Sequence, residues 1–277
     1  MSKRWLMPGL LALTFGWSVA AAQETPPPVR PDAASIQWAP RSGNDCGRYR
    51  GRRVCNGPRR VPLLTGEAEA RATAMGLVGG AVARHATTGP VPEAWVHAAQ
   101  SEGARAAPNL LWPVPDGRLW RGFGRRHGFA RRRGRLIRTR TQRMHNGVDI
   151  GATEGAPIVA VNDGLVVYSD NGMHGYGNAV LITHADGSVS MYAHCIETYV
   201  VPGQLVRRGA VIAAVGQTGI THGAHLHFEY RSAGELRDPL TLFVNIPERP
   251  TPRGVAPAPS EEEQDAPPNE TSHDVEP

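Results

Sequence analysis

The sequence predicts an all-β domain in the second half of the chain, preceded by a small helical unit and flanked by disordered tails. From residue 156 onward, short runs rich in β-branched residues alternate with Gly, Asp and Asn, a spacing typical of antiparallel sheets. Asp163-Gly164 and Asp186-Gly187 are turn signals between such runs. The expected strands are residues 157–161, 164–169, 179–183, 188–193, 210–215 and 225–230.

The helical unit is expected before this domain. Thr65 precedes a run rich in Ala and Glu that extends to Leu77, so we expect an N-capped helix there. A second short helix is expected after Pro92, through Ala99. Neither helix carries a recognisable chemistry, and the role of residues 46–107 stays open.

The first 22 residues have the features of a secretory signal peptide. Lys3 and Arg4 precede an apolar run that ends in three alanines at 20–22. A membrane anchor is the alternative, but the apolar run is shorter than the roughly 20 residues that a spanning helix needs. We therefore expect an exported protein without a membrane span after signal cleavage, located in the periplasm, the cell envelope or the medium.

Two further segments have the composition of disordered chain. Residues 23–45 are rich in Pro and polar residues and indicate a flexible linker, and residues 247–277 form a Pro-rich acidic tail. Between them, Cys46 and Cys55 close a short loop that an exported chain can oxidise, so we expect a disulfide there. Cys195 is left over and is expected to be a buried apolar residue.

The chain is basic, with a formal net charge of +5 and an isoelectric point near 9.5. The excess is concentrated between Arg118 and Arg143. Outside a cytoplasm, the acidic partners for such a charge are cell-wall polymers and lipid phosphates. No nucleic-acid-binding motif accompanies the charge, which argues against nucleic acid as a partner.

His225 and His227 lie two residues apart in one of the expected strands. A period of two places both imidazoles on one face of that strand and Leu226 on the other. Leu226 can then enter the core while both histidines face a cleft.

A second group consists of His145 and Asp149, four residues apart across a flexible Gly147. Imidazole nitrogens and carboxylate oxygens are good zinc ligands, and two histidines with one carboxylate leave a fourth position open for water. Either group alone is weak evidence, because such spacings occur by chance in many chains.

A third motif, Tyr192-Ala193-His194, makes the combination specific. The order H-x-x-x-D, Y-A-H and H-L-H-F-E resembles that of the lysostaphin/LytM-type zinc metalloendopeptidases. The resemblance covers roughly half of the chain, in the family's order, and includes Trp112-Pro113-Val114, Phe123-Gly124-Arg125, Gly155-Ala156-Pro157-Ile158, Asp163-Gly164, Tyr176-Gly177-Asn178, Gly203-Gln204 and Gly216-Gln217-Thr218-Gly219.

The resemblance implies a role for each of five residues. His145, Asp149 and His227 would bind one zinc ion per chain. His194 and His225 would be the catalytic residues that flank the bound water and the scissile carbonyl. The sequence leaves open which of these two is the base and which stabilises the oxyanion. The implied fold is the family's small twisted antiparallel β-domain, with the site in a groove across one sheet.

The chain departs from the family pattern in two places. An Arg-rich insertion lies between Arg125 and His145, and it is either a basic rim of the groove that meets peptide carboxylates or a solvated loop. Thr221-His222-Gly223-Ala224 stands where the family usually has Thr-Gly-Pro, so His222 is expected close to the site as a loop residue. Glu229 shares a strand face with His227 and either supports it or makes an ordinary surface contact.

The residues and the resemblance together favour a zinc metalloendopeptidase that hydrolyses peptide bonds in peptidoglycan, with its catalytic domain at residues 108–246. One alternative is a catalytically silent LytM-type regulator that activates other wall hydrolases, against which the complete set of site residues argues. Another is a secreted peptidase that attacks proteins or foreign cell walls with the same site. The bond cleaved, whether D-alanyl-diaminopimelate, glycyl-glycine or another, is not predicted.

Overall fold

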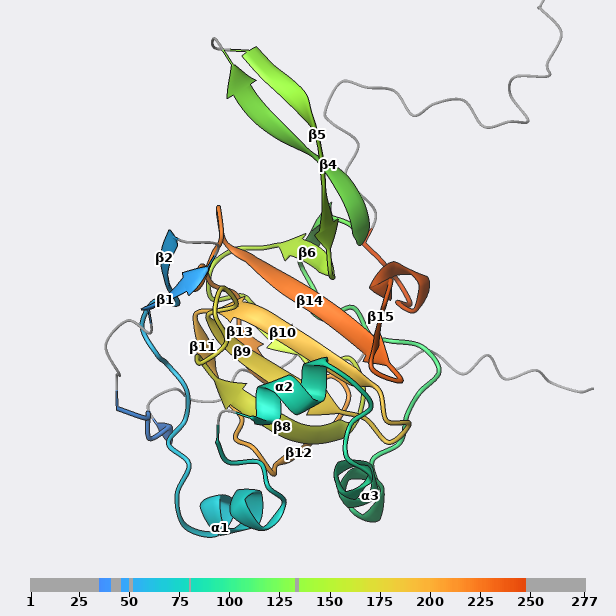
Figure 1. Cartoon of the computed structure of the whole chain (residues 1–277). Coiled ribbons are helices and arrows are strands. Elements are labelled where there is room, and N and C mark those ends of the chain that lie inside the picture. The colour runs from blue at the N-terminus through green and yellow to red at the C-terminus, as the bar shows by residue number, and fades with distance from the viewer. Residues whose placement is uncertain (1–34, 41–45, 50–51, 80, 133–134, 248–277) are drawn as a thin grey trace, which may run out of the picture.

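A sheet of eight antiparallel strands dominates the protein (Figure 1). The computed structural model describes residues 35–40, 46–49, 52–79, 81–132 and 135–247, so the expected signal peptide, most of the expected linker and nearly all of the expected C-terminal tail lie outside it. In spatial order the strands are β12 (Leu205–Val206), β8 (Gly164–Asp170), β9 (Asn178–Thr183), β10 (Val189–Cys195), β14 (His225–Ser232), β6 (Val148–Gly151) and β3 (Arg118–Arg121), with β15 (Glu235–Arg237) also paired to β14.

Three smaller sheets complete the β-structure. The expected all-β fold is confirmed, and the six expected strands correspond to β7, β8, β9, β10, β13 and β14. The Cys46–Cys55 disulfide closes the two-stranded sheet of β1 and β2, and Cys195 is buried and free, both as expected. The smaller sheets are β11 (Glu197–Thr198), β13 (Val211–Ala214) and β7 (Pro157–Val159); β1 (Cys46–Tyr49) and β2 (Arg52–Cys55); and β4 (Gly124–Arg132) and β5 (Arg135–His145).

The central strands of the large sheet are buried on both faces. Val180 and Ile182 of β9 belong to one core, which also contains residues of β7 and β13. Leu181 of β9 and Met191 of β10 belong to a second core on the opposite face. Because successive side chains of a strand point to opposite faces, these near-continuous apolar runs require a layer of structure on each side.

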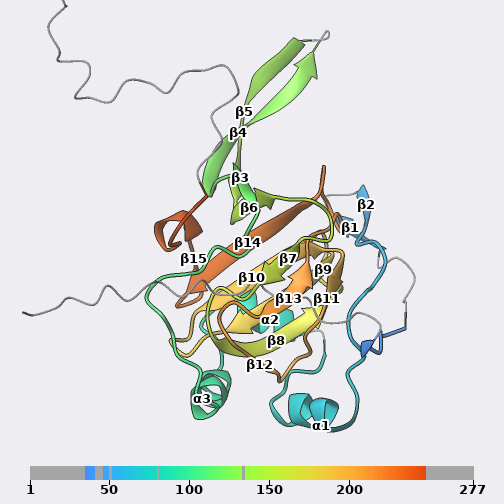
Figure 2. The same ribbon diagram turned by 180° about the vertical axis from the view of Figure 1, so that it is seen from behind.

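Helices supply the second of these layers. The helices are α1 (Gly66–Ala74), α2 (Val82–Thr87) and α3 (Glu93–Ser101), followed later by a 3-10 turn at Pro239–Thr241. Figure 1 shows α2 over the face formed by β8 and β9, and Figure 2 shows β7 and β13 on the far face. Trp95 of α3 is buried in the same core as Leu165 of β8, so the helical region covers the sheet and is not a free-standing unit.

The predicted helices are present, with two differences. Thr65 occupies the N-cap position of α1, but its side chain makes no capping hydrogen bond. Helix α2 was not predicted, because its six residues are too few to display a helical period. No helix in the described part of the chain has the length and apolar character that crossing a membrane requires.

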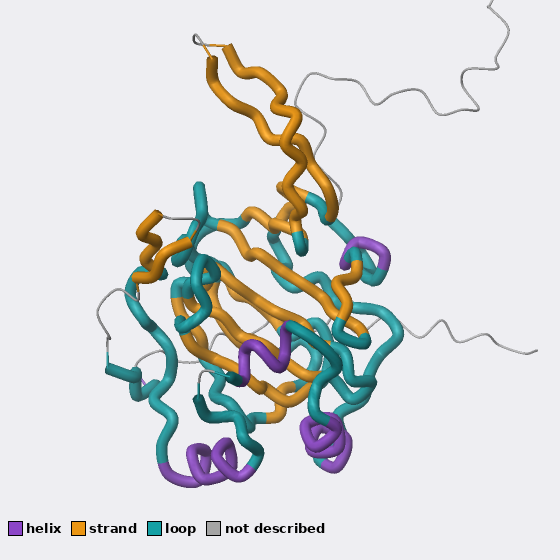
Figure 3. The backbone as a smooth tube through the Cα atoms, in the orientation of Figure 1, coloured by secondary structure: helices purple, strands orange, loops and turns teal. Residues whose placement is uncertain are grey.

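The Arg-rich insertion forms a β-hairpin instead of a loop. Strands β4 and β5 pair from Gly124 opposite His145 to Arg132 opposite Arg135, and the hairpin projects from the body of the protein (Figures 1 and 3). Backbone pairing along the whole insertion explains how a segment so rich in charge can be regular. Its second strand ends at His145, so the hairpin leads directly into the site.

Candidate active site

Strand β14 presents two histidines on one side of the large sheet. His225 and His227 line the same cleft, while Leu226 and Phe228 are fully buried in the core. This is the alternation that the sequence predicts. The register between β14 and β6 then places His227 opposite Asp149.

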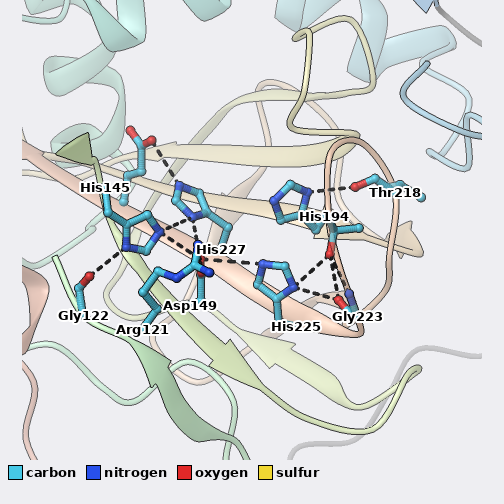
Figure 4. A network of polar contacts seen from close by, with 11 residues as sticks. Arg121, Gly122, His145, Asp149, His194, Thr218, Gly223, His225 and His227 are labelled. Atoms are coloured by element: carbon cyan, nitrogen blue, oxygen red, sulfur yellow. Dashed lines mark hydrogen bonds and ion pairs between the residues drawn. The ribbon is translucent and has the colours of Figure 1, made fainter. Parts of the chain in front are cut away.

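His145 and Asp149 meet His227 at one point. Gly147, between them, allows the chain to lie against β14, since a Cβ at this position would lie 2.0 Å from the carbonyl oxygen of Phe228. The Oδ1 atom of Asp149 is 3.0 Å from Nε2 of His145 and 2.9 Å from Nδ1 of His227. The ligand atoms of these three residues all lie within 4.8 Å of one another (Figure 4).

The other ring nitrogens of both histidines are held by hydrogen bonds. Nδ1 of His145 lies 2.8 Å from the carbonyl oxygen of Gly122, and Nε2 of His227 lies 3.2 Å from Oε1 of Glu229. Glu229 is almost fully buried and also accepts a hydrogen bond of 2.9 Å from the hydroxyl of Tyr176. Such partners fix the ring orientation of metal-binding histidines, so Glu229 supports His227 and is not a surface residue.

The charges around His227 favour a cation at this point. Burial alone would lower the pKa of His227, but hydrogen bonds with Asp149 and Glu229 outweigh it and raise that pKa to about 9. Burial would raise the pKa of Asp149, whereas hydrogen bonds with His145 and His227 hold it well below its usual range. Two buried carboxylates thus stabilise positive charge here, and the donor set of two imidazoles and one carboxylate fits a zinc ion.

His194 lies next to this cluster on a bulge at the end of β10. Its backbone has a φ of 64°, and the pairing of β10 with β9 shifts register between Tyr192 and Cys195. The backbone N–H of His194 donates to the carbonyl of Tyr176, and Nδ1 lies 2.8 Å from the carbonyl oxygen of Thr218. The bulge turns His194 into the cleft, which it lines.

His225 faces His194 across the cleft, with ring centroids 4.8 Å apart. Nδ1 of His225 lies 2.8 Å from the carbonyl oxygen of Gly223 and 3.1 Å from the hydroxyl of Thr221. Nε2 of His225 lies 3.6 Å from Oδ1 of Asp149. In both histidines, the hydrogen bond to a carbonyl places the proton on Nδ1 and leaves Nε2 as a proton acceptor.

The pKa values of His194 and His225 are lowered, whereas that of His227 is raised. Burial lowers the pKa of His194 to about 3, and electrostatic interactions with His227 and His225 lower it further. Burial also lowers the pKa of His225. Both imidazoles are therefore neutral near pH 7 and able to accept a proton.

The cleft also contains residues that sequence reasoning missed. It has a volume of about 210 Å³, and Trp120 and Arg121 of β3 form part of its wall, as does the expected loop residue His222. Trp120 stacks against His225, with ring centroids 5.8 Å apart. The pairing of β3 with β6 shifts register between Leu119 and Arg121, so Trp120 and Arg121 do not follow the alternation of a regular strand. The sequence pattern therefore gave no sign that they reach the cleft.

Asn56, outside the cleft, was also missed, and it holds the loops behind His194. Its side-chain amide donates to the carbonyl oxygens of Asn171 at 2.6 Å and Met173 at 3.0 Å, and its Oδ1 accepts from the N–H of Gly175 at 3.0 Å. Its own carbonyl accepts from the N–H of Gly219 at 3.0 Å. Asn56 therefore joins the loop before Tyr176 to the loop of Thr218, the two residues that bond to His194.

Comparison with known proteins gives a family for this region. Residues 143–239 match the model of Peptidase family M23. Among curated proteins, the chain is 41% identical over 108 residues to the DD-carboxypeptidase/endopeptidase Mpg of Neisseria meningitidis serogroup B, covering 39% of this chain and 25% of the relative. It is 37% identical over 141 residues to the murein hydrolase activator NlpD of Salmonella typhimurium, covering 50% of this chain and 33% of the relative. The chain thus spans a quarter to a third of the length of these relatives.

Solved structures of peptidases are also similar to this chain. A zinc-containing peptidase from Vibrio cholerae has 31% identity and a TM-score of 0.39, over 49% of this chain and 40% of that one. The catalytic domain of lysostaphin from Staphylococcus simulans has 27% identity and a TM-score of 0.38, over 46% of this chain and 91% of that one. The assignment rests on the sequence matches and not on these scores. Residues 143–239, which contain the converging histidines and Asp149, are therefore the part of the chain that is similar to peptidase family M23.

Proposed function

We propose that this protein is a zinc-dependent endopeptidase that hydrolyses peptide bonds in peptidoglycan. The observation that carries the proposal is the convergence of His145, Asp149 and His227 on one point, beside two neutral histidines in the same cleft. The family description and the relative named DD-carboxypeptidase/endopeptidase support a peptidase. Both named relatives support the cell wall as the place of action.

His145, Asp149 and His227 would hold the zinc ion. His145 would offer Nε2 and His227 would offer Nδ1, since the other nitrogen of each ring bonds to Gly122 or Glu229. A bound zinc ion lowers the pKa of its water to about 7 and polarises a carbonyl group. Because His227 must be neutral to bind metal, zinc uptake by this site would release a proton.

His194 and His225 would move the protons of the reaction. Each presents Nε2 to the cleft as an acceptor, so one can take the proton of the attacking water. The other, once it carries a proton on Nε2, can donate a hydrogen bond to the oxygen of the scissile carbonyl or give the proton to the leaving amine. Their low pKa values keep both as acceptors at neutral pH.

A regulatory protein is the second candidate. The relative named murein hydrolase activator matches half of this chain at 37% identity, so the comparisons support activation of another hydrolase as well as catalysis. The two functions make different demands on the site. Activation requires only a surface for a partner, whereas hydrolysis requires the three ligands and the two neutral histidines.

We also propose that the chain acts in the cell envelope. The expected signal peptide at residues 1–22 and the disulfide between Cys46 and Cys55 support export, because disulfides persist in oxidising compartments.

Mass spectrometry of digested walls tests the proposal. Zinc-loaded protein is incubated with purified peptidoglycan of several chemotypes, and the released fragments are analysed for new amine and carboxyl ends. The expected result is new peptide ends from the parent and none from the His227→Ala variant. If the parent releases none but increases the activity of an added wall hydrolase, and His227→Ala does so equally, the regulatory function replaces the catalytic one.

A further inference from the structure

A bulge in the edge strand β3 turns two consecutive side chains toward the cleft. The pairing of β3 with β6 shifts register between Leu119 and Arg121, and both Trp120 and Arg121 line the cleft. The Trp120 ring fixes this direction, because it lies against Gly151, where a Cβ would approach the ring within 2.0 Å. Bulges that redirect side chains in this way are frequent beside active sites.

Arg121 brings a positive charge to the edge of the metal-binding cluster. Its Nη1 lies 3.6 Å from Oδ2 of Asp149 (Figure 4). The contacts of Asp149 with His145, His225 and His227 are made by the other oxygen, Oδ1. Among the described residues that line the cleft, Arg121 alone carries a permanent positive charge. Its side chain is 54% exposed, and so long an ion pair at an exposed position contributes little to stability. The guanidinium is therefore available to a ligand.

We propose that Arg121 binds a free α-carboxylate on the residue whose amine leaves during hydrolysis. The inference rests on the proposed function and adds a substrate class to it. A guanidinium forms two parallel hydrogen bonds with a carboxylate, which gives orientation as well as affinity. Arg121 adjoins Asp149, so the carboxylate that it reaches belongs to a residue at the scissile bond. The α-carboxylate of the leaving residue is attached to the carbon that bears the scissile nitrogen, and it satisfies this condition.

This assignment separates two classes of wall peptide. A terminal D-alanyl-D-alanine bond has such a carboxylate, and so has a D-alanyl bond to the free-acid centre of diaminopimelate. A glycyl-glycine bond inside a cross-bridge has none. Arg121 therefore favours substrates of the first class. It does not favour glycyl-glycine cross-bridges, because they have no carboxylate to pair with the guanidinium.

Two peptides that differ in one group test the inference. One ends in D-alanyl-D-alanine with a free carboxylate, and the other is its C-terminal amide. We expect zinc-loaded protein to cleave the acid with a kcat/KM about 10- to 100-fold higher than the amide, the scale of a hydrogen bond to a charged group. In Arg121→Gln, the kcat/KM for the acid should fall to that for the amide, while the kcat/KM for the amide and the zinc content stay unchanged. Arg121→Lys should retain part of the preference.

Arg118→Gln is the matched control, because Arg118 is exposed on the same strand but does not line the cleft. This variant makes the same change of charge and should keep the full preference. Equal cleavage of acid and amide by the parent, or an equal loss on both in Arg121→Gln, overturns the inference and leaves the proposed function intact. If the parent cleaves neither peptide, the digestion of purified walls still decides on the proposed function, and calorimetric titration with the same two peptides decides whether Arg121 binds the carboxylate. Tighter binding of the acid in the parent, but not in Arg121→Gln, supports the inference; equal binding overturns it.

Discussion

The two halves of the cleft are built in different ways. In the proposed ligand half, Asp149 and His227 lie on the adjacent strands β6 and β14, whose register brings their side chains together, and His145 ends β5 just before β6 begins. The proposed catalytic half, His194 and His225, depends on carbonyl groups of loops, those of Thr218 and Gly223. The ligand half is charged and favours a cation, whereas the catalytic half is neutral. A single cleft thus brings a cluster of candidate metal ligands next to two neutral histidines that are not among the converging ligand atoms.

The largest effect should follow from breaking the ligand half. In His227→Ala, one of three protein ligands is lost, so zinc content and peptidoglycan hydrolysis should both fall to background. Elemental analysis of purified protein and release of soluble wall fragments measure the two quantities. His97→Ala, at an exposed position on α3, is the control and should keep both. A His227→Ala protein that retains one zinc per chain would show that the ligands lie elsewhere.

Breaking the catalytic half should separate metal from activity. His194→Ala and His225→Ala should each keep zinc, because neither side chain is among the three converging ligands. Turnover should fall about 100-fold or more, the scale for losing an acid-base or oxyanion group. Zinc content and kcat measured on the same preparations test this. Loss of zinc from either variant would contradict the division of the cleft into two halves.

A smaller effect is expected from the carboxylate behind His227. Glu229→Gln keeps the shape of the side chain but removes the charge that holds Nε2 of His227. Zinc affinity should fall about 10- to 100-fold, as is usual for partners of metal ligands. Competition with a fluorescent chelator measures it. Unchanged affinity would mean that the strand register alone orients His227.

Asn56→Ala tests how the catalytic half is held. The variant loses the side-chain amide that holds the loop of Asn171 and Gly175 behind His194, while the backbone bond from Gly219 to residue 56 remains. We expect kcat to fall about tenfold with zinc content unchanged, because small displacements of catalytic groups are costly. Arg60→Ala is the control: it removes the ion pair with Glu197 on the same segment without touching either loop. Should both variants lose activity in proportion to their melting temperatures, Asn56 is only a stabilising residue.

In metal-free protein, pH should affect the two halves in opposite directions. His227 has a folded pKa of about 9, so its contribution to stability is complete below about pH 6.5 and is lost as pH rises to 9. His194 has a folded pKa of about 3, so the unfolded chain takes up a proton that the folded chain does not, and stability falls as pH decreases from about 6.5 to 3. Each slope is about 1.4 kcal/mol per pH unit. Urea unfolding of the parent should show both slopes; His227→Gln should flatten the alkaline side, and His194→Gln the acid side.

The sequence predicted what depends on local alternation. The period of two in β14 was enough to place His225 and His227 on one face and Leu226 in the core. The spacing of His145 and Asp149 suggested a ligand pair but was weak evidence alone, and the resemblance to a family supplied the role of His194, which no period reveals. The roles of these residues as ligands and catalysts stay predictions until metal and turnover are measured.

The rest depends on partners that are distant in the sequence. Arg121 reaches the cleft through a bulge that exists only in the pairing of β3 with β6. Asn56 acts through backbone groups more than a hundred residues away, such as those of Asn171 and Gly175. A polar residue that bonds to distant backbone leaves no pattern in its own neighbourhood. The regular hairpin of the Arg-rich insertion was missed because its composition resembles that of a solvated loop.

The helical layer on the large sheet limits how short a segment can be when the site is transplanted into another protein. The matched family region begins at residue 143, whereas the helices that cover Leu181 and Met191 end by residue 101. A graft that begins at the family boundary would carry the histidines and Asp149 of the cleft, but it would lose Trp120 and Arg121 and leave one face of its central strands open to water. Such a hydrophobic face promotes aggregation. The smallest transferable piece is therefore larger than the recognisable motif, and its lower limit is set by what the sheet must bury and not by what the cleft must contain.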